Sequence, residues 1–239
     1  MSRKVSWIVI GATAWAILAS SPVALAQAPT PPELVASEAT IEITNPWYRM
    51  PVGRRLSYRE RTEDGVETTD IWVTGETRMI NGILCTVVFD RVYLDGELIE
   101  ETKDYIVQNK ATGDVWYYGE AVDNFKNGRF KDHDGSWIAG ENGAEPGIWM
   151  PGDPKVGLEF RMEYLKGVAE DMGRVEAALT EVKSGGKTYK DCVQVREHTP
   201  LEPNAKEDKY YCRDIGAQVL LIDRETGTRS ELQAIRGPH

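Results

Sequence analysis

The sequence predicts an all-β protein: a single-domain antiparallel meander that forms a curved sheet, a half-barrel or a sandwich. Short runs rich in Val, Ile, Thr, Tyr and Trp alternate between apolar and polar residues, as half-buried strands do. No segment has a convincing helical period, and the best candidate, residues 169–178, contains Gly173. Dipeptides that favour tight turns separate the runs, as in a series of hairpins: Asp64-Gly65, Asn81-Gly82, Asp95-Gly96, Asn127-Gly128, Asp134-Gly135 and Gly185-Gly186.

The expected strands follow one another along the chain with short connections. The long hairpin from Ile83 to Gln108 turns at Asp95-Gly96, and long twisted strands of this kind curl around a hydrophobic interior. Neighbouring residues of a strand point to opposite faces, so core packing is the expectation for five aromatic residues: Trp116, Tyr117, Tyr118, Trp137 and Trp149. The strands cover residues 54–62, 66–75, 77–80, 83–94, 97–108, 114–119, 136–139, 157–165, 174–183, 188–197, 207–213, 216–223 and 228–235.

Residues 1–26 have the pattern of a secretory signal peptide. Arg3 and Lys4 precede an apolar run, and the small residues Ala24 and Ala26 form a cleavage site. We therefore expect periplasmic or secreted localisation after cleavage near Ala26. The apolar run is too short, and too closely followed by Pro22, to give the mature form a stable membrane span.

The mature chain divides into two parts. Residues 27–44 read as a Pro-rich flexible lead, and residues 45–239 as a single β-rich domain, because all-β domains of this size often remain single. The formal charge is −10, and removal of Arg3 and Lys4 with the signal peptide makes it −12. A surface this acidic repels nucleic acid, so no nucleic-acid partner is expected.

The three cysteines predict one disulfide. In a hairpin centred on Glu202, Cys192 faces Cys212, and directly opposed positions on two strands are close enough to be bridged. Cys85 lies in an apolar run, where a lone cysteine usually acts as a small buried hydrophobe. No C-x-x-C motif is present to support redox exchange or a thiolate zinc site.

Residues 145–174 are the most unusual stretch of the chain. Pro146, Pro151 and Pro154 withhold backbone donors, so an ordered irregular loop is predicted there. A strand is predicted to follow this loop over residues 157–165, where apolar and polar side chains alternate.

An acidic pair, Glu170 and Asp171, comes shortly after this strand. Gly167 and Gly173 flank the pair, and glycines let the backbone turn the carboxylates inward. There they would accept charge-assisted hydrogen bonds or bind a cation. We therefore predict that the pair is a structural or functional anchor.

Other chemical motifs find little support. Residues 130–141 fit an EF-hand loop at several acidic positions, but Phe130 occupies the first ligand position, which favours an acidic hairpin turn. His133, His198 and His239 are scattered and give no zinc-binding spacing. Signatures of nucleophile elbows, Walker loops and dinucleotide-binding loops are absent from the sequence.

Four motifs resemble a family of uncharacterised secreted bacterial β-rich proteins: GSW-x-AG, PGI-x-MP, G-x-AED and TPLEP, the last followed by a KYY strand. The resemblance covers roughly Asn45 to Asp223. It implies that residues 135–171 and 199–211 belong to one architecture, and it implies no activity. Typical members have Ala-Pro-Gly where this chain has Cys212-Arg213-Asp214, which leaves a pairing of Cys85 with Cys192 open.

Two classes of function remain. The first is a non-catalytic binding protein for an apolar small molecule, a lipid or an envelope component, held in the curve of the sheet. The second is a metal-assisted hydrolase or lyase with catalytic candidates Glu163, Glu170, Asp171 and His198. In the second, Glu170, Asp171 and His198 are the candidate ligands of a divalent cation such as calcium.

Overall fold

The computed structural model describes residues 33–238, and all of their regular secondary structure is β. The predicted signal peptide and the start of the predicted lead, residues 27–32, lie outside the described residues. Within the described part of the chain, no helix is long and apolar enough to cross a membrane. All described strand pairs are antiparallel, so the prediction of an all-β, antiparallel fold is confirmed.

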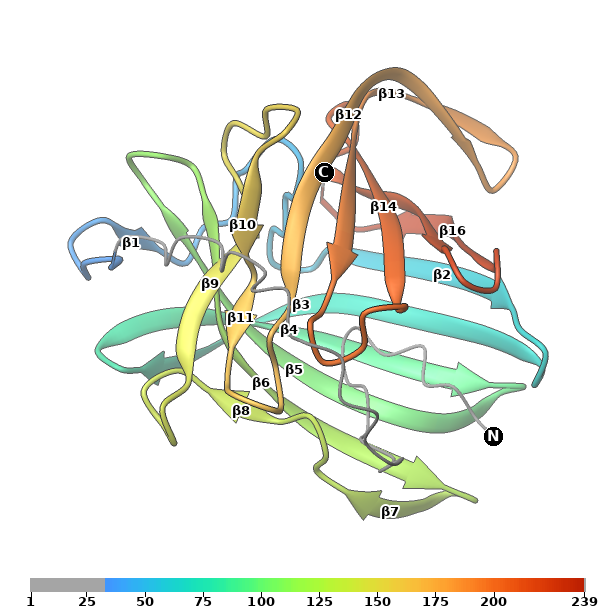
Figure 1. Cartoon of the computed structure of the whole chain (residues 1–239), viewed down its shortest axis with the longest axis horizontal. Helices are drawn as coiled ribbons and strands as arrows, with labels where there is room; N and C mark the ends of the chain where they lie inside the picture. Colours follow the sequence, from blue (N-terminus) through green and yellow to red (C-terminus); the bar gives the residue numbers. More distant parts are fainter. Residues whose placement is uncertain (1–32, 239) are drawn as a thin grey trace, which may run out of the picture.

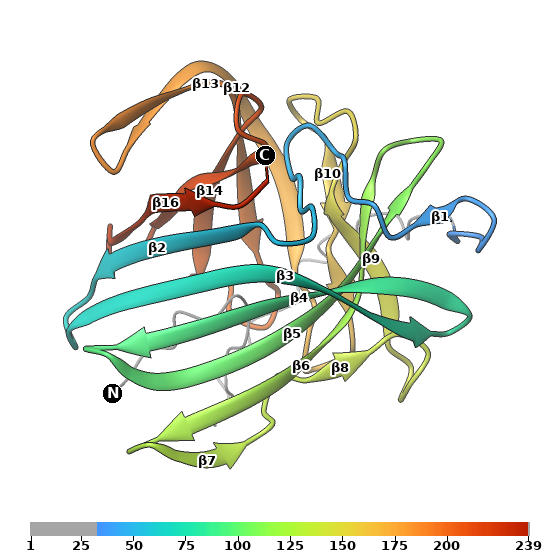
Figure 2. The ribbon, with the colours of Figure 1, turned by 180° about the vertical axis from the view of Figure 1, so that it is seen from behind.

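The described strands join into a single antiparallel sheet. Figures 1 and 2 show β2 to β6 as a broad curved layer, with β12 and β14 rising on the other side. The strands are β1 (Ala39–Thr40), β2 (Arg55–Arg61), β3 (Val66–Ile80), β4 (Ile83–Leu94), β5 (Glu97–Asn109), β6 (Val115–Lys126), β7 (Arg129–Asp132), β8 (Trp137–Ile138), β9 (Glu145–Met150), β10 (Glu159–Arg161), β11 (Glu163–Tyr164), β12 (Met172–Ser184), β13 (Lys187–His198), β14 (Lys206–Cys212), β15 (Ala217–Asp223) and β16 (Arg229–Arg236).

The order of strands shows how the sheet closes on itself. Its path runs β10-β12-β13-β14-β15-β16-β2-β3-β4-β5-β6-β9-β11. The two ends of this path, β10 and β11, are separated in sequence by Met162 alone. The segment 159–164, which we call the seam, therefore pairs with one edge of the sheet through β10 and with the other edge through β11. The result is a nearly closed, barrel-like sheet.

The seam corrects two predictions. Residues 157–165 were expected to form one strand, but Met162 interrupts it because β10 and β11 pair with different partners. The expected irregular loop contains strand β9, in which Pro146 lies at the edge opposite Glu163. A Cβ atom at Gly147 would lie 2.3 Å from the Met162 carbonyl oxygen, so the two backbones approach more closely there than a side chain allows.

Polar contacts hold the seam closed. The Met162 N–H donates to the carbonyl oxygen of Asp171 at 2.9 Å. The Arg161 guanidinium donates to the Glu145 carboxylate at 2.7 Å and also lies over the ring of Tyr164. The stretch that stood out in the sequence is thus the segment that joins the two edges of the sheet.

Other boundaries also differ from expectation. Strand β3 continues through Gly75, where two strands were predicted, because a bulge between Val73 and Thr77 absorbs the irregular residues. Strand β6 extends to Lys126, well beyond the predicted end at residue 119. It pairs with β5 along this extension and then with the short strand β7, which the sequence did not predict.

The described part of the predicted flexible lead, residues 33–44, is packed against the sheet. Leu34 and Ile43 are buried in the core, so apolar burial compensates for the loss of chain entropy. The backbone N–H groups of Thr44 and Asn45 both donate to the side-chain oxygen of Gln108, at 2.7 and 2.8 Å.

The aromatic residues are in the core, as predicted. Trp116, Tyr117, Tyr118, Trp137 and Trp149 are all buried. Tyr117 lies edge-on to two of the tryptophans, with ring centroids 5.2 Å from Trp137 and 4.8 Å from Trp149. This packing confirms the expected core role of these five residues.

The disulfide joins Cys192 to Cys212, at directly opposed positions of β13 and β14. Cys85 is a buried free thiol. The prediction made from the hairpin is therefore confirmed, and the alternative pairing of Cys85 with Cys192 is wrong.

Replacing both bridged cysteines by serine should lower the free energy of unfolding by about 3 kcal/mol. The bridge closes a loop with a sequence separation of 20 residues, and that loop restricts the unfolded chain. Urea unfolding of the wild type, with and without a thiol reductant, and of the double variant would measure the effect. An unfolding midpoint that neither reduction nor substitution shifts would contradict this expectation.

Candidate functional site

The inner face of the sheet presents many acidic side chains. In β5, alternation places Glu100, Thr102 and Asp104 on the same buried face. Most members of this group are buried, and Asp171 and Glu207 are half-buried. We call the group the interior carboxylate cluster: Glu60, Glu67, Asp90, Glu100, Asp104, Glu120, Glu163, Asp171, Glu197 and Glu207.

Like charges oppose each other across neighbouring strands of this face. Glu60 is the cross-strand partner of Glu67, Asp104 that of Glu120, and Glu197 that of Glu207. Directly opposed like charges destabilise a sheet, so local pairing alone does not explain this arrangement. Violations of local rules of this kind are expected at functional sites.

Lys209 interacts with acids from several strands, which shows that these acids face one common interior. It is buried on β14, and its ammonium donates to Glu197 and lies 3.5 Å from Glu207. Burial lowers the pKa of Lys209, but Glu197 and Glu207 outweigh burial and raise it above its usual value. Its charge also lowers the pKa values of acids on β4, β5 and the seam, which lie far from it in sequence: Asp90, Asp104 and Glu163.

Burial is the main cause that raises the pKa values of most acids of the cluster: Glu60, Glu67, Asp90, Asp104, Glu120, Glu163, Asp171 and Glu207. It raises the pKa of Glu67 to about 8, and those of Asp104, Asp171 and Glu207 to about 7. Neighbouring carboxylates add to this effect in each case. Several acids of the interior thus change their protonation state close to neutral pH.

Glu120 and Glu163 are the centre of the cluster. Both are fully buried, and neither oxygen of either carboxyl has a hydrogen-bond partner among the described residues. Burial, and then the charge of Glu163, raises the pKa of Glu120 well above its usual value. The nearby indole N–H of Trp137 partly lowers the pKa of Glu163. The two groups nevertheless do not reach hydrogen-bond geometry, so the Trp137 N–H also has no hydrogen-bond partner among the described residues. Unpaired polar groups of this kind are costly, so they need an explanation.

The phenol groups of Tyr117 and Tyr211 also line this interior. The hydroxyl of Tyr117 donates to Asp104 at 2.7 Å, which secures one member of the cluster. Tyr211 lies on the same face of β14 as Lys209 and is buried, but its hydroxyl has no partner among the described residues. After burial, the charge of Glu197 is the next cause that raises the pKa of Tyr211.

The structure separates the predicted site residues into two groups. Glu163 and Asp171 come together, since the N–H of Met162, the residue before Glu163, donates to the Asp171 carbonyl oxygen at 2.9 Å. After burial, the charge of Asp171 is the main cause that raises the pKa of Glu163. Glu170 instead accepts a hydrogen bond from the Gly167 N–H at 2.7 Å and closes a local turn. His198 is half-buried, with its Nε2 3.7 Å from a Glu159 carboxylate oxygen.

The predicted metal ligands therefore have different neighbours. Over residues 33–238, no group of three or more His, Cys, Asp or Glu side chains is placed to hold a metal ion. Burial lowers the pKa of His198, and the charge of Glu159 partly offsets this. The charged group nearest to the His198 ring is thus Glu159, which was not among the predicted site residues.

Single substitutions of Asp171 and Glu170 should have different effects on stability, because only Asp171 faces the interior. Asp171→Asn should raise the thermal midpoint at pH 8, because it removes a charge from the interior, and should have little effect at pH 5. Glu170→Gln should change stability by no more than about 0.5 kcal/mol, as at ordinary surface positions. Thermal unfolding at both pH values, with and without calcium, would measure this. Equal effects of the two substitutions, or a calcium-dependent midpoint lost in either, would contradict the assignment.

The sequence did contain a signal for the cluster. Asp90 interrupts the apolar run of β4, and Glu100 and Asp104 occupy alternate positions that a half-buried strand reserves for apolar residues. Motif spacing did not reveal these acids because no short spacing connects them. They meet only when the sheet curves.

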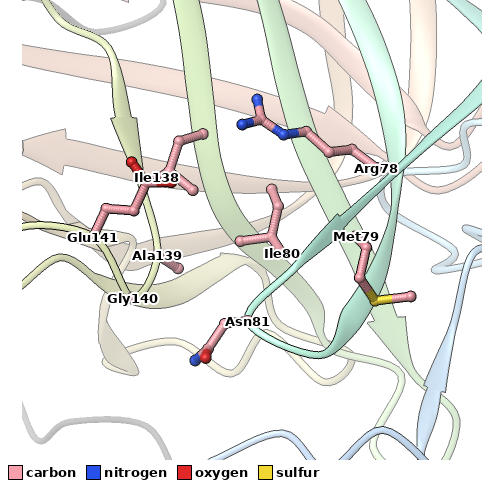
Figure 3. Close-up of a pocket in the computed structure, with 8 residues that line it drawn as sticks. All are labelled: Arg78, Met79, Ile80, Asn81, Ile138, Ala139, Gly140 and Glu141. Carbon is pink, nitrogen blue, oxygen red and sulfur yellow. The ribbon is translucent and has the colours of Figure 1, made fainter.

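Two pockets open at the surface, away from the cluster. One of about 430 Å³ lies between residues 41–52 and the β3–β4 hairpin, and Ile41, Ile43 and Val52 are among its lining residues. The other, of about 200 Å³, is shown in Figure 3, with Arg78 and Ile80 on one side and Ile138 and Glu141 on the other. The Arg78 guanidinium already donates to the Tyr105 hydroxyl at 2.7 Å. Neither pocket contains a predicted site residue.

Comparisons with known proteins give one structural likeness. No family model matches the chain, and no curated protein matches it. The fold is similar to the crystal structure of a putative lipoprotein from Parabacteroides distasonis, with 8% sequence identity and a TM-score of 0.38. The similarity covers 80% of this chain and 98% of that one. A likeness at this level gives no information about the ligand or the chemistry of the site.

Proposed function

We propose that this protein is a non-catalytic binding protein of the cell envelope, periplasmic or secreted, that holds its ligand inside the curved sheet. The main support is the pair Glu120 and Glu163, whose four carboxyl oxygens lack partners in a fully buried position. A bound molecule would supply the missing donors. It would also offset the cost of gathering these acids in one place.

The inner face also offers apolar surface beside the acids. Leu56 of β2 is opposite Ile71 of β3, and Val195 lies on β13 beside Lys209. The three apolar side chains are buried. A ligand with an apolar body and a polar group would use both kinds of surface, which agrees with a lipid, an apolar small molecule or another envelope component.

Binding explains the arrangement better than catalysis does. The acids extend over strands from β2 to β14, whereas a reaction centre needs its groups to converge on one bond. One observation favours the alternative, a hydrolase or lyase: Asp171, with a pKa of about 7, lies beside Glu163 and could exchange protons near neutral pH. A metal-assisted reaction would additionally need a cation bound there.

Native mass spectrometry of the protein, purified without chelator, tests the proposal. We expect a co-purified small molecule that is lost or reduced in the Glu120→Gln/Glu163→Gln variant and retained in the Glu63→Gln/Glu141→Gln variant. Glu63 and Glu141 are exposed and outside the cluster, so they form a matched control. A stoichiometric metal in place of the molecule would favour the enzyme alternative. Equal retention by both variants would exclude the interior as the site.

Export is a separate prediction. N-terminal sequencing of protein from the envelope fraction should begin at Gln27, because cleavage is expected after Ala26. A cytoplasmic protein that still begins with the intact Arg3-Lys4 segment would contradict the proposed location. Binding by the interior would then need another biological setting, but the structural argument for the site would stand.

A further inference from the structure

We infer that the larger surface pocket binds one unbranched hydrocarbon chain whose polar head has no negative charge. The pocket lies between residues 41–52 and the β3–β4 hairpin, and its volume is about 430 Å³. Small-molecule sites usually measure about 300–1,000 Å³, so the pocket has room for a single chain. None of its lining residues belongs to the interior carboxylate cluster, so the inference does not depend on the proposed function.

The surface of this pocket is mostly apolar, and its polar groups already have partners. Met50 is a buried apolar member of the lining. The Thr86 hydroxyl donates to the Ile41 carbonyl oxygen at 2.7 Å, and the Thr44 hydroxyl accepts from the Gln108 amide at 3.1 Å. Among residues 33–238, none of the buried side-chain polar atoms that lack a partner lines this pocket. The pocket therefore suits a hydrocarbon chain, which brings no polar groups of its own.

Hydrogen bonds hold the two sides of the pocket in place without a ligand. The Met50 N–H donates to the Ile43 carbonyl oxygen at 3.1 Å, which fixes the loop before β2. The Gly53 N–H donates to the Val73 carbonyl oxygen at 2.8 Å, which joins this loop to β3 beside its bulge. A preformed pocket does not have to be ordered when a ligand binds, so more of the apolar contact contributes to affinity.

The apolar surface continues from the pocket along the hairpin. Thr77 and Thr86 are cross-strand partners that line the pocket. The next pair on the same face is Met79 and Leu84, roughly 7 Å further along the strands. Met79 is 61% exposed and Leu84 is 40% exposed, and Figure 3 shows the Met79 side chain directed away from Ile138. Exposed apolar side chains that extend a pocket in one direction suit an elongated ligand.

The charges at the pocket select the head group. Glu42 and Glu76 both line the pocket and are exposed, and none of the described lining residues is Lys, Arg or His. A carboxylate or phosphate head would be repelled by these two carboxylates and would find no cation to pair with. A head without negative charge avoids this repulsion.

Isothermal titration calorimetry with monolaurin, below its critical micelle concentration, tests the inference. We expect the wild type to bind, and a dissociation constant at least about tenfold higher in Ile41→Asp/Val52→Asp. Ile41 and Val52 line the pocket and are 42% and 60% exposed, so the fold should tolerate their substitution. The single variant Val52→Asp serves if the double variant does not fold, and circular dichroism checks folding.

Val156→Asp/Val168→Asp is the matched control. These two valines are 59% and 39% exposed and do not line the pocket, so the variant should bind monolaurin as the wild type does. Equal binding by the two double variants would overturn the inference. So would a wild type that does not bind monolaurin.

Laurate at pH 8 tests the head group, because it has the same chain as monolaurin and an anionic head. The wild type should bind laurate at least about fivefold more weakly than monolaurin, and Glu42→Gln/Glu76→Gln should narrow this difference. Equal affinities of the wild type for the two molecules would overturn the selection of the head group.

Two further outcomes would assign the pocket or the chain differently. Loss of monolaurin binding in Glu120→Gln/Glu163→Gln, with binding retained in Ile41→Asp/Val52→Asp, would place the chain in the interior. That result would overturn this inference and leave the proposed function standing. A dimer in size-exclusion chromatography that Ile41→Asp/Val52→Asp dissociates would show that a second copy of the chain covers the pocket, which would also overturn the inference.

Discussion

Unfolding of the protein should require less free energy at pH 8 than at pH 5, with a difference on the order of 3 kcal/mol. The expected loss follows from acids that stay protonated in the folded state. For Asp104, which is buried, the pKa rises from 3.8 to about 7. A shift of about three pKa units is worth about 4 kcal/mol in full, of which about 3 kcal/mol falls between pH 5 and pH 8, and other members of the cluster add to it or share it.

The sign follows from the direction of the shifts. Between the ordinary pKa of a carboxyl group and the raised value, the folded state binds a proton that the unfolded chain has released. Stability therefore falls as the pH rises through this window. The window ends near pH 7 for Asp104, Asp171 and Glu207, and near pH 8 for Glu67. Lys209 remains charged throughout, because its pKa is raised.

The Glu120→Gln/Glu163→Gln variant should lose less stability between pH 5 and pH 8 than the wild type does. Glutamine keeps the shape of each side chain and removes its charge, so the remaining acids repel each other less. Urea unfolding at a series of pH values would measure the dependence, and Glu63→Gln/Glu141→Gln should reproduce the wild-type curve. A wild type that gains stability towards pH 8 would show that the interior acids are paired in the folded state.

Arg54→Met should destabilise the protein by about 4 kcal/mol, because it leaves buried carbonyl oxygens unpaired. Arg54 is completely buried, and its guanidinium donates to the carbonyl oxygens of Arg49, Ile215 and Gly216. The last two contacts measure 2.6 Å to Ile215 and 3.1 Å to Gly216. This one side chain thus joins the loop before β2 to the turn between β14 and β15.

Arg49→Met is the matched control. The Arg49 guanidinium makes exposed contacts of 3.3 and 3.4 Å to the carbonyl oxygens of Arg213 and Asp214, which compete with water. Its loss should cost less than about 1 kcal/mol. Chemical unfolding of the two variants would compare the two arginines directly. Equal losses would mean that the buried guanidinium does not hold the turn.

The hairpins of this fold could be predicted from the sequence because their cause is local. Asn81, Asp95 and Asn127 all have positive φ angles, of 45°, 48° and 53°, and each precedes a glycine that also has a positive φ. Asn, Asp and Gly tolerate this conformation better than other residues, so the dipeptides by themselves indicate tight turns. The pairing of Cys192 with Cys212 was predictable for a similar reason, because both residues belong to one hairpin.

The seam and the carboxylate cluster depend on long-range pairing, which no local pattern shows. The break at Met162 exists because β10 and β11 join opposite edges of the sheet. Strand β14 has charged residues on both faces: Lys209 points inward, whereas Asp208 pairs with Arg196 on the other face. Alternation alone cannot tell which of these faces is the interior, because both contain charges.

Infrared spectroscopy of the carboxyl groups across a pH titration tests the central claim most directly. The claim is that Glu120, Glu163 and their neighbours are buried without enough cations to balance them. At pH 7 the wild type should retain a band from protonated carboxyl groups, which is smaller in Glu120→Gln/Glu163→Gln and unchanged in Glu63→Gln/Glu141→Gln. A wild type in which every carboxyl group is ionised well below pH 6, with no such band at pH 7, would contradict the account.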